Sequence, residues 1–265
     1  MKTNFHTHTF RCNHAAGRDE EYVLSAIAGH YQILGFADHC PWPFSGGYRS
    51  HMRMDPKQGL QDYLKSIRAL REQYKSQIEI RIGLECEYFP PYMDWLRPMV
   101  QKEKLDYLIL GNHFEYSEEK GIYFGRAVVN ETMLNRYVDS ALEGMSTGLY
   151  AYLAHPDLFM RGYPGFDHYC EKASVRLCRA AKERGFPLEY NLCGALDNRR
   201  TGEERYPHHL FWQIAAAEGC DVIIGVDAHS PGALEDDSLR QEGIRLLEGY
   251  GAHLIDRIPY LHFDR

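Results

Sequence analysis

The sequence predicts an α/β fold in which seven parallel strands, each followed by a helix, close into a TIM-like (β/α)7 barrel. Short apolar runs alternate with longer segments whose apolar residues recur at i, i+3, i+4 and i+7, which is typical of a parallel sheet covered by helices. Nearly every apolar run ends in a histidine or a carboxylate. An open sheet would gather such residues in one crevice, whereas contributions from nearly all strand ends indicate a barrel with its site at the carboxyl ends.

The expected elements follow one another along the chain without a low-complexity tract. Residues 3–8 contain the β-branched and aromatic side chains that strands favour. The expected strands are 3–8, 33–38, 78–84, 105–112, 150–154, 187–191 and 221–227. The expected helices, assigned from their periodicity, are 19–30, 56–75, 92–102, 131–145, 167–184, 207–218 and 235–249. We expect residues 1–265 to form one barrel domain, which is an ordinary length for such a fold.

Histidines and carboxylates occur where the expected strands end. His6 and His8 are two residues apart and project from the same face of a strand, and Asp227 and His229 repeat this spacing near the other end of the chain. Comparable positions are taken by His14, His39, Glu85, His113 and His155. A lone histidine after a strand is usually structural, but seven of fourteen at one topological position indicate a metal site of several ions. Imidazole with carboxylate suits Zn, Mn or Fe better than calcium.

Composition and charge argue against several other classes of protein. The net charge is −7 and no dense run of Lys or Arg is present, so we expect no nucleic-acid partner. No apolar run approaches the length of a membrane span, so we expect no membrane partner. Seven cysteines without a C-x-x-C pair favour reduced thiols in the cytoplasm, with Cys40 and Cys86 buried as small hydrophobes. The oligomeric state stays open.

The ordered motifs HTH, CNH, ADH, GLECEYF, GNHF, AHPD and VDAH resemble the polymerase and histidinol phosphatase (PHP) superfamily. Their spacing, over almost the whole chain, is most similar to the monofunctional histidinol-phosphatase branch. The resemblance implies a distorted seven-stranded barrel that holds three divalent transition-metal ions. It places one ion on His6, His8, Glu85 and Asp227, a second on Glu85, His113 and His155, and a third on His14, His39 and His229. Asn4 is a departure, because many relatives carry an aspartate there.

The charge of such a site predicts its chemistry. Three divalent ions, two carboxylates (Glu85 and Asp227) and neutral imidazoles give the site a net charge of about four positive units. This charge attracts a phosphate dianion. Metal coordination lowers the pKa of water to about 7, so we expect a metal-bridging hydroxide, held by Glu85 and Asp227, as the nucleophile. The predicted activity is that of a phosphoric monoester hydrolase, and the resemblance favours L-histidinol phosphate, an intermediate of histidine biosynthesis, as the small-molecule substrate.

Four arginines are candidate contacts to the phosphate, because a guanidinium suits bidentate phosphate binding. Arg161 follows His155 at the position where this branch carries a basic contact. Arg199 and Arg200 are expected in a loop after the sixth strand, and Arg53 in the loop after the second. The sequence leaves open which of them reaches the site.

Three alternative functions stay open at this stage. Another PHP phosphoesterase could act on a nucleotide or a sugar phosphate, since metal ligands specify the reaction and not the alcohol. A metal-dependent amidohydrolase also begins with an HxH motif in a barrel, but its usual lysine is absent here and it leaves His14 unexplained. A non-catalytic metal-binding protein is the third alternative.

Overall fold

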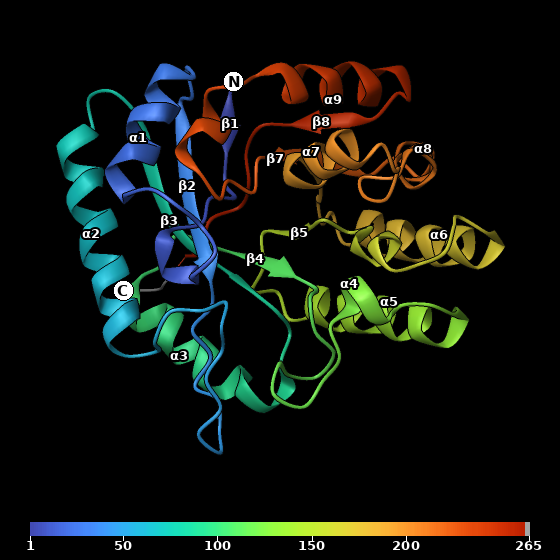
Figure 1. Ribbon diagram of the computed structural model, residues 1–265, viewed down its shortest axis with the longest axis horizontal. Coiled ribbons are helices and arrows are strands. Elements are labelled where there is room, and N and C mark those ends of the chain that lie inside the picture. The colour runs from blue at the N-terminus through green and yellow to red at the C-terminus, as the bar shows by residue number, and fades with distance from the viewer. Residues whose placement is uncertain (263–265) are drawn as a thin grey trace.

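The computed structural model, which describes residues 1–262, contains eight parallel strands hydrogen-bonded in chain order from β1 to β8. The sheet is curled and its helices lie along the outside (Figure 1). The strands are β1 (Thr3–Asn4), β2 (Ile33–His39), β3 (Glu79–Cys86), β4 (Tyr107–Gly111), β5 (Tyr152–Ala154), β6 (Leu188–Asn191), β7 (Asp221–Gly225) and β8 (His253–Ile255). The parallel direction and order of the strands follow the prediction, but the predicted count of seven was one short. The short, partly exposed β8 gave no clear alternation in the sequence.

Seven of the helices correspond to those expected from periodicity. The helices are α1 (Asp19–Ala28), α2 (Gln58–Tyr74), α3 (Met93–Glu103), α4 (Phe124–Ala127), α5 (Glu131–Ser146), α6 (His168–Glu183), α7 (Leu192–Thr201), α8 (His209–Ala217) and α9 (Ser238–Gly249). Four short 3-10 turns are η1 (Phe10–Cys12), η2 (Pro90–Tyr92), η3 (Leu158–Arg161) and η4 (Pro231–Leu234).

Helix α7 occupies the segment that the sequence analysis expected to be a loop, so that expectation was wrong. The side chain of Asn191 caps the helix by accepting a hydrogen bond of 2.8 Å from the Gly194 backbone N–H. Gly202 ends it in the left-handed region, with φ of 71°. Arg199 and Arg200 therefore lie in the last turn of a helix, which fixes their directions.

The first and seventh strands approach each other at their carboxyl ends. Beyond β1, the backbone N–H of His8 donates to the carbonyl of Ala228, and the N–H of Ala228 donates to the carbonyl of His6, at 3.0 and 3.1 Å. The buried side chain of Asn4 also accepts a hydrogen bond from the Val226 backbone N–H at 2.9 Å. The departure at Asn4 thus has a structural role, because this side chain links β1 to the segment that follows β7.

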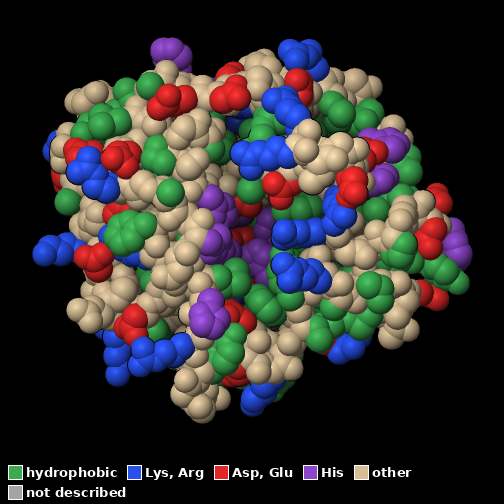
Figure 2. Space-filling view, in the orientation of Figure 1, with side chains coloured by type: hydrophobic (Ala, Val, Ile, Leu, Met, Phe, Trp, Pro, Cys, Tyr) green, Lys and Arg blue, Asp and Glu red, His purple; other side chains and the backbone are tan. Residues whose placement is uncertain are grey.

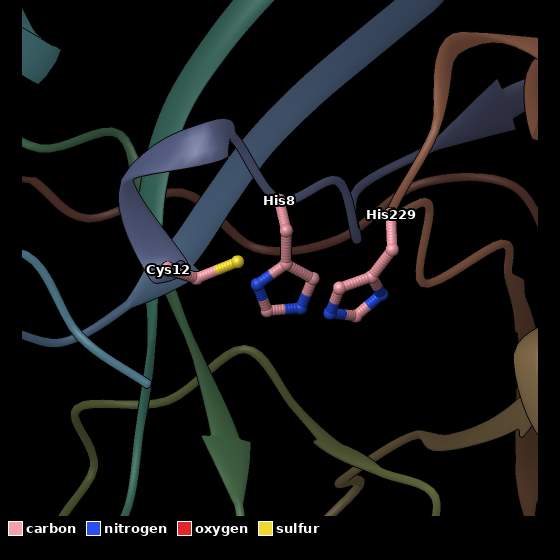
Figure 3. A group of neighbouring side chains, drawn as sticks. All are labelled: His8, Cys12 and His229. Atoms are coloured by element: carbon pink, nitrogen blue, oxygen red, sulfur yellow. The ribbon is translucent and has the colours of Figure 1, made fainter. Parts of the chain in front are cut away.

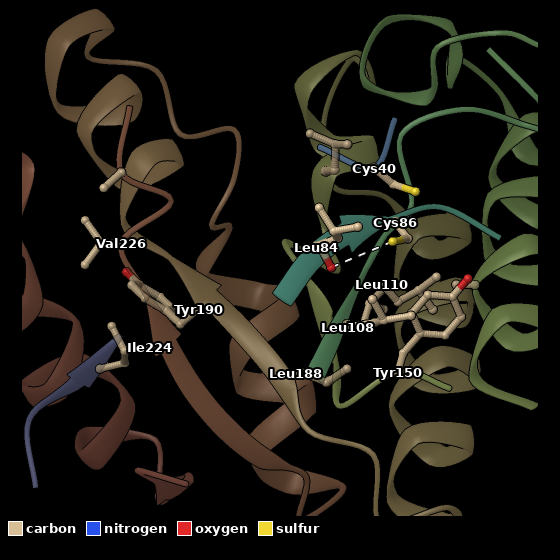
Figure 4. Packing of buried hydrophobic residues seen from close by; sticks show 14 of the residues in the cluster. Cys40, Leu84, Cys86, Leu108, Leu110, Tyr150, Leu188, Tyr190, Ile224 and Val226 are labelled. Carbon is tan, nitrogen blue, oxygen red and sulfur yellow. Dashed lines mark hydrogen bonds between the residues drawn. The ribbon is translucent and has the colours of Figure 1, made fainter. Parts of the chain in front are cut away.

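The core has one layer inside the curled sheet and a larger one between the sheet and its helices. The inner layer contains Phe5, Tyr107 and Tyr152, and the Tyr107 hydroxyl donates to the Phe5 carbonyl at 2.7 Å. In the outer layer, Cys40 and Cys86 pack among leucines of neighbouring strands, with the Cys86 thiol directed at the Leu84 carbonyl (Figure 4). Both thiols are fully buried, which confirms the prediction that they act as small hydrophobes. All seven cysteines are free.

Within residues 1–262, none of the helices has both the length and the apolar character needed to cross a bilayer.

Candidate metal centre

The nine residues predicted as metal ligands meet at the carboxyl ends of the strands. Their side chains come from the segments that follow β1, β4, β5 and β7, from the ends of β2 and β3, and, for His14, from the turn after η1. Figure 2 shows histidine side chains gathered in a central hollow on this face, with basic side chains on its right-hand edge. All nine are buried except His14 and His229, which lie nearer the surface.

Within this hollow, the nitrogen and oxygen atoms form compact groups. In each of three groups, the potential ligand atoms lie within 4.8 Å of one another: His6, His8 and Asp227; Glu85, His113 and His155; and His14, His39 and His229. The last two equal sets implied by the resemblance, and the first contains three of the four residues implied for its ion, without Glu85. A fourth such group joins His8, His39 and Glu85. The groups are therefore contiguous, so neighbouring ions would be close enough to share a ligand.

Glu85 lies at the centre of these groups. Its Oε1 atom is 3.1 Å from His155 Nε2 and 3.3 Å from His113 Nε2. Its Oε2 atom is 2.9 Å from His39 Nδ1 and 3.5 Å from His6 Nε2. The two oxygens thus face different histidines, which is the arrangement that a bridging carboxylate requires.

His14 and His229 face each other in a way that fits a shared metal ion. The Nδ1 atom of His14 is 2.7 Å from the Cys12 carbonyl, and that of His229 is 3.0 Å from the Asp227 carbonyl. Because a carbonyl only accepts hydrogen bonds, both Nδ1 atoms carry the proton of a neutral imidazole. The two Nε2 atoms then direct lone pairs at each other across 3.0 Å. Two ligands of one tetrahedral zinc, each about 2.0–2.1 Å from the ion, are roughly 3.3 Å apart, so the pair fits a shared metal.

A second layer of acidic groups orients the inner histidines. Glu189 accepts a hydrogen bond from His6 Nδ1 at 2.8 Å, and Glu87 accepts one from His113 Nδ1 at 2.9 Å. Asp38 lies 3.4 Å from His8 Nδ1. Such partners fix the tautomer that leaves Nε2 free for a metal. None of the three was predicted from the sequence.

The sequence did hold a signal for two of these acids. Glu87, one residue past the end of β3, is two residues after Glu85, the spacing that places two side chains on the same side of an extended chain. Glu189 is an acid in the middle of an expected strand.

Two glycines make room for the buried carboxylates. A Cβ atom at Gly111 would lie 2.5 Å from Glu85 Oε1, and one at Gly225 would lie 2.3 Å from the Glu189 carboxylate. These distances are far below van der Waals contact, so the neighbouring strands β4 and β7 can carry no side chain there. The Gly before Asn112 in the GNHF motif and the Gly before Val226 are thus part of the site.

The charged groups of the centre perturb one another's pKa values strongly in the metal-free protein. Burial alone would raise the pKa of Glu85 and of Asp227, but the surrounding histidines hold both well below the ordinary range. Burial lowers the pKa of His8, but hydrogen bonds to Asp227 and Asp38 outweigh it and raise that pKa to about 9. Burial and the neighbouring His8 lower the pKa of His229 to about 4. The centre therefore holds anionic carboxylates beside a neutral His229.

Two buried carboxylate oxygens of the centre face histidine nitrogens without good hydrogen-bond geometry. Among the residues that the structure describes, Glu85 Oε2 lies 2.9 Å from His39 Nδ1 and Asp227 Oδ1 lies 3.0 Å from His8 Nε2, but neither contact has the geometry of a good hydrogen bond. A buried carboxylate oxygen that is poorly satisfied is costly, and coordination of a cation removes this cost. The residues present therefore fit divalent metal ions.

Cys12 lies beside the ligands although it was not predicted to be one of them. Its thiol sulfur is directed at the ring of His8, and the ring of His229 lies on the opposite side of His8 (Figure 3). The potential ligand atoms of these three side chains lie within 4.8 Å of one another. Burial and the charge of Asp38 raise the pKa of this thiol to about 12. The thiol is therefore protonated, and its sulfur borders the metal centre as a neutral group.

Two of the four arginines proposed to bind substrate are engaged elsewhere. Arg53 is buried, and each of its three guanidinium nitrogens already donates a hydrogen bond, to Glu118, to the Cys40 carbonyl and to Glu87. Arg199 is exposed and pairs with Glu242 on α9 at 2.6 Å. These pairings favour a structural role for Arg53 and Arg199 over a contact with substrate, because each has its own carboxylate partners.

Arg161 and Arg200 lie at the mouth of the centre. Arg161, at the end of η3, is held by the Tyr123 hydroxyl at 3.0 Å from its Nη1 atom. Arg200 lines a cavity of about 410 Å³ that begins at Asp227 and His229 and also includes Cys193. Burial and the charge of Asp227 raise the pKa of Cys193, and the charges of Arg161 and Arg200 oppose the shift. Both guanidiniums are therefore close enough to Cys193 for their charges to act on its thiol.

Comparison with known proteins identifies the family. The model of the PHP domain matches residues 4–192. The chain belongs to the PHP domain family. A probable histidinol-phosphatase of Deinococcus radiodurans is 28% identical to this PHP protein over 236 residues, which are 86% of each chain. A histidinol-phosphatase of Bacillus subtilis is 24% identical over 257 residues, covering 88% of this chain and 95% of the relative.

Among solved structures, a histidinol phosphate phosphatase of Lactococcus lactis, in complex with zinc, L-histidinol and phosphate, superposes with a TM-score of 0.74. The superposition covers 98% of this chain and 99% of that one, at 20% sequence identity. This PHP protein and the Lactococcus enzyme therefore share their fold over the full length.

Proposed function

We propose that this PHP protein is a metal-dependent phosphomonoesterase that hydrolyses L-histidinol phosphate to L-histidinol and phosphate. The Deinococcus and Bacillus relatives named histidinol-phosphatase align with it over 86% and 95% of their own length, so the likeness to them is not confined to a shared domain. The Lactococcus structure that shares its fold holds zinc together with the two products of this reaction. Its free cysteines fit a reducing compartment such as the cytoplasm.

Three divalent ions are the number that the donor groups accommodate. The observation that carries this part of the proposal is the pair of facing Nε2 atoms of His14 and His229, at 3.0 Å, beside the separate groups around His6 and His155. Glu85 would be shared between ions, because its two oxygens face different histidines. Zinc, manganese and iron all accept imidazole with carboxylate. When bound, such ions supply positive charge for the phosphate and acidify a coordinated water.

The chain's own residues supply orientation and charge. Glu85 and Asp227 stay ionised at neutral pH, so they keep the centre ready for cations. Arg161 is held by Tyr123 and stands at the mouth, where a planar guanidinium can bind two phosphoryl oxygens. Arg200 would either make a second phosphate contact or face the alcohol part of the ester, because it lines the cavity that leads away from Asp227. The aliphatic side chains of Leu192 and Val226 in that cavity would pack against the alcohol.

Release of phosphate from L-histidinol phosphate tests the proposal. The protein is purified, stripped of metal, and reconstituted with Zn²⁺ or Mn²⁺ before the assay. We expect turnover that depends on the added metal and that disappears in the Glu85→Gln variant prepared in parallel, which excludes a contaminating phosphatase. Equal phosphate release by both proteins, or none by the reconstituted wild type, would contradict the proposal.

A further inference from the structure

Arg53 is at the centre of a buried network of charges that leads to a proposed metal ligand. Its guanidinium donates from Nη2 to Glu87 Oε1, from Nε to Glu118 Oε2 at 2.6 Å, and from Nη1 to the Cys40 carbonyl at 3.1 Å. The same Glu87 Oε1 atom accepts the hydrogen bond from His113 Nδ1 at 2.9 Å. One carboxylate oxygen thus joins the guanidinium to the imidazole.

The other contacts of the network leave Glu87 a single orientation. Its second oxygen, Oε2, accepts a hydrogen bond from the indole N–H of Trp42 at 2.9 Å. The hydroxyl of Tyr48 donates to the free oxygen of Glu118 at 3.0 Å. The side chains of Arg53 and Glu87 are each 1% exposed. A buried pair of this kind resists rearrangement, because every alternative position leaves a charge unpaired.

The network also joins two segments that are distant in sequence. Arg53 belongs to the segment between β2 and α2, whereas Glu118 belongs to the segment between β4 and α4 that carries His113. A pairing that served stability alone would need only one of the two carboxylates. Here the planar guanidinium bonds to both, on the side of Glu87 that faces His113.

From this geometry we infer that Arg53 is a positioning residue of the metal centre, which holds Glu87 in the orientation that keeps His113 Nε2 directed at the ion it shares with Glu85 and His155. The inference rests on the proposed function only in taking His113 as a metal ligand, and it is independent of which phosphate ester is hydrolysed.

Metal retention by variants of the full-length protein tests this role without any substrate. Zinc-loaded wild type and Arg53→Met are titrated with a chelator, and retained zinc is measured by elemental analysis. We expect one ion to leave Arg53→Met at a chelator concentration about 10-fold to 100-fold lower than in the wild type, the loss typical of removing an outer partner of a ligand. Arg53→Lys should give an intermediate shift, because an ammonium cannot bond both carboxylates in one plane.

Arg240→Met is the matched control. Arg240 is also buried, but it lies on α9 and donates to the Thr3 carbonyl at 3.4 Å, away from Glu87. Its loss should lower thermal stability and leave the zinc retention curve unchanged. If Arg53→Met retains zinc as well as the wild type does, the inference is wrong. If Arg53→Met does not fold, the same result for Arg53→Lys would show that the inference is wrong. A wild type that holds no zinc would instead count against the proposed function.

Discussion

One oxygen of the Glu85 carboxylate, Oε1, lies 3.1 Å from His155 Nε2, while the other, Oε2, makes no hydrogen bond within the described part of the chain. Substitution by glutamine keeps the shape of the side chain and removes its charge. We expect Glu85→Gln to lose at least one ion per chain and to reduce kcat/KM by more than about 10²-fold, because the group serves two clusters of histidines. Elemental analysis and phosphate-release kinetics measure both effects.

Glu79 is the matched control for this substitution. It lies at the exposed start of the same strand, β3. Glu79→Gln should keep the metal content and activity of the wild type. If Glu85→Gln retains all metal ions and full turnover, Glu85 does not bridge two metal ions.

Metal uptake should depend on pH through His8. In the metal-free protein its pKa is raised from 6.5 to about 9, so the protonated form stabilises the fold below pH 6.5, and this contribution is lost as pH rises through about 9. Because a metal binds the neutral imidazole, the apparent affinity for the ion on His8 should rise by about tenfold per pH unit over this range. Chelator competition at pH 6.5, 7.5 and 8.5 measures the slope. A flat profile would mean that no proton leaves His8 when the metal binds.

Gly111 should not tolerate a methyl group. A Cβ atom there would lie 2.5 Å from Glu85 Oε1 and 2.8 Å from the His113 ring, so Gly111→Ala must displace one of these two ligands. We expect a clear loss of zinc, measured by elemental analysis after dialysis. Gly165→Ala is the control, because a Cβ at Gly165 meets nothing within 4 Å. Equal zinc contents in the two variants would place the Glu85 carboxylate elsewhere.

The sequence predicted the side chains that converge in the metal centre, because period-two spacing and the ends of parallel strands determine direction and place. His6 and His8, and Asp227 and His229, are close in the structure for this reason. The strand order followed from the alternation of strands and helices. The eighth strand did not, because His253–Ile255 is short and partly exposed and is defined by its pairing with β7.

The roles of the arginines could not be predicted, because they depend on partners that are distant in the chain. Arg53 pairs with Glu118, 65 positions away, and Arg199 pairs with Glu242, 43 positions away. No local sequence pattern distinguishes an arginine that pairs with a carboxylate of the protein from one that is free to bind phosphate. The acid Glu189 did show a local signal, its place in the middle of a strand, but its partner could not be predicted, since His6 is 183 positions away.

Arg161 should bind phosphate without holding a metal. Arg161→Ala is expected to keep its ions and to lose about 10²-fold to 10³-fold in kcat/KM, as for removal of one donor to a developing oxyanion. Arg161→Lys should recover only part of the loss, because the ammonium lacks the planar fork. Arg199→Ala is the control, since Arg199 is exposed and paired with Glu242. If Arg161→Ala keeps full activity, the phosphate contact is elsewhere, and Arg200 is the residue to test next.

The central claim is that this PHP protein is specific for L-histidinol phosphate. Its most direct test is a comparison of kcat/KM for this ester with values for nucleotide monophosphates, sugar phosphates and p-nitrophenyl phosphate, all measured on one zinc-loaded preparation. A site that makes polar contacts to the imidazole and amine of the alcohol rejects esters that lack these groups by about 10⁴-fold or more. We predict a preference of this order for L-histidinol phosphate. Similar values across all the esters, or a clear preference for a nucleotide or sugar phosphate, would contradict it.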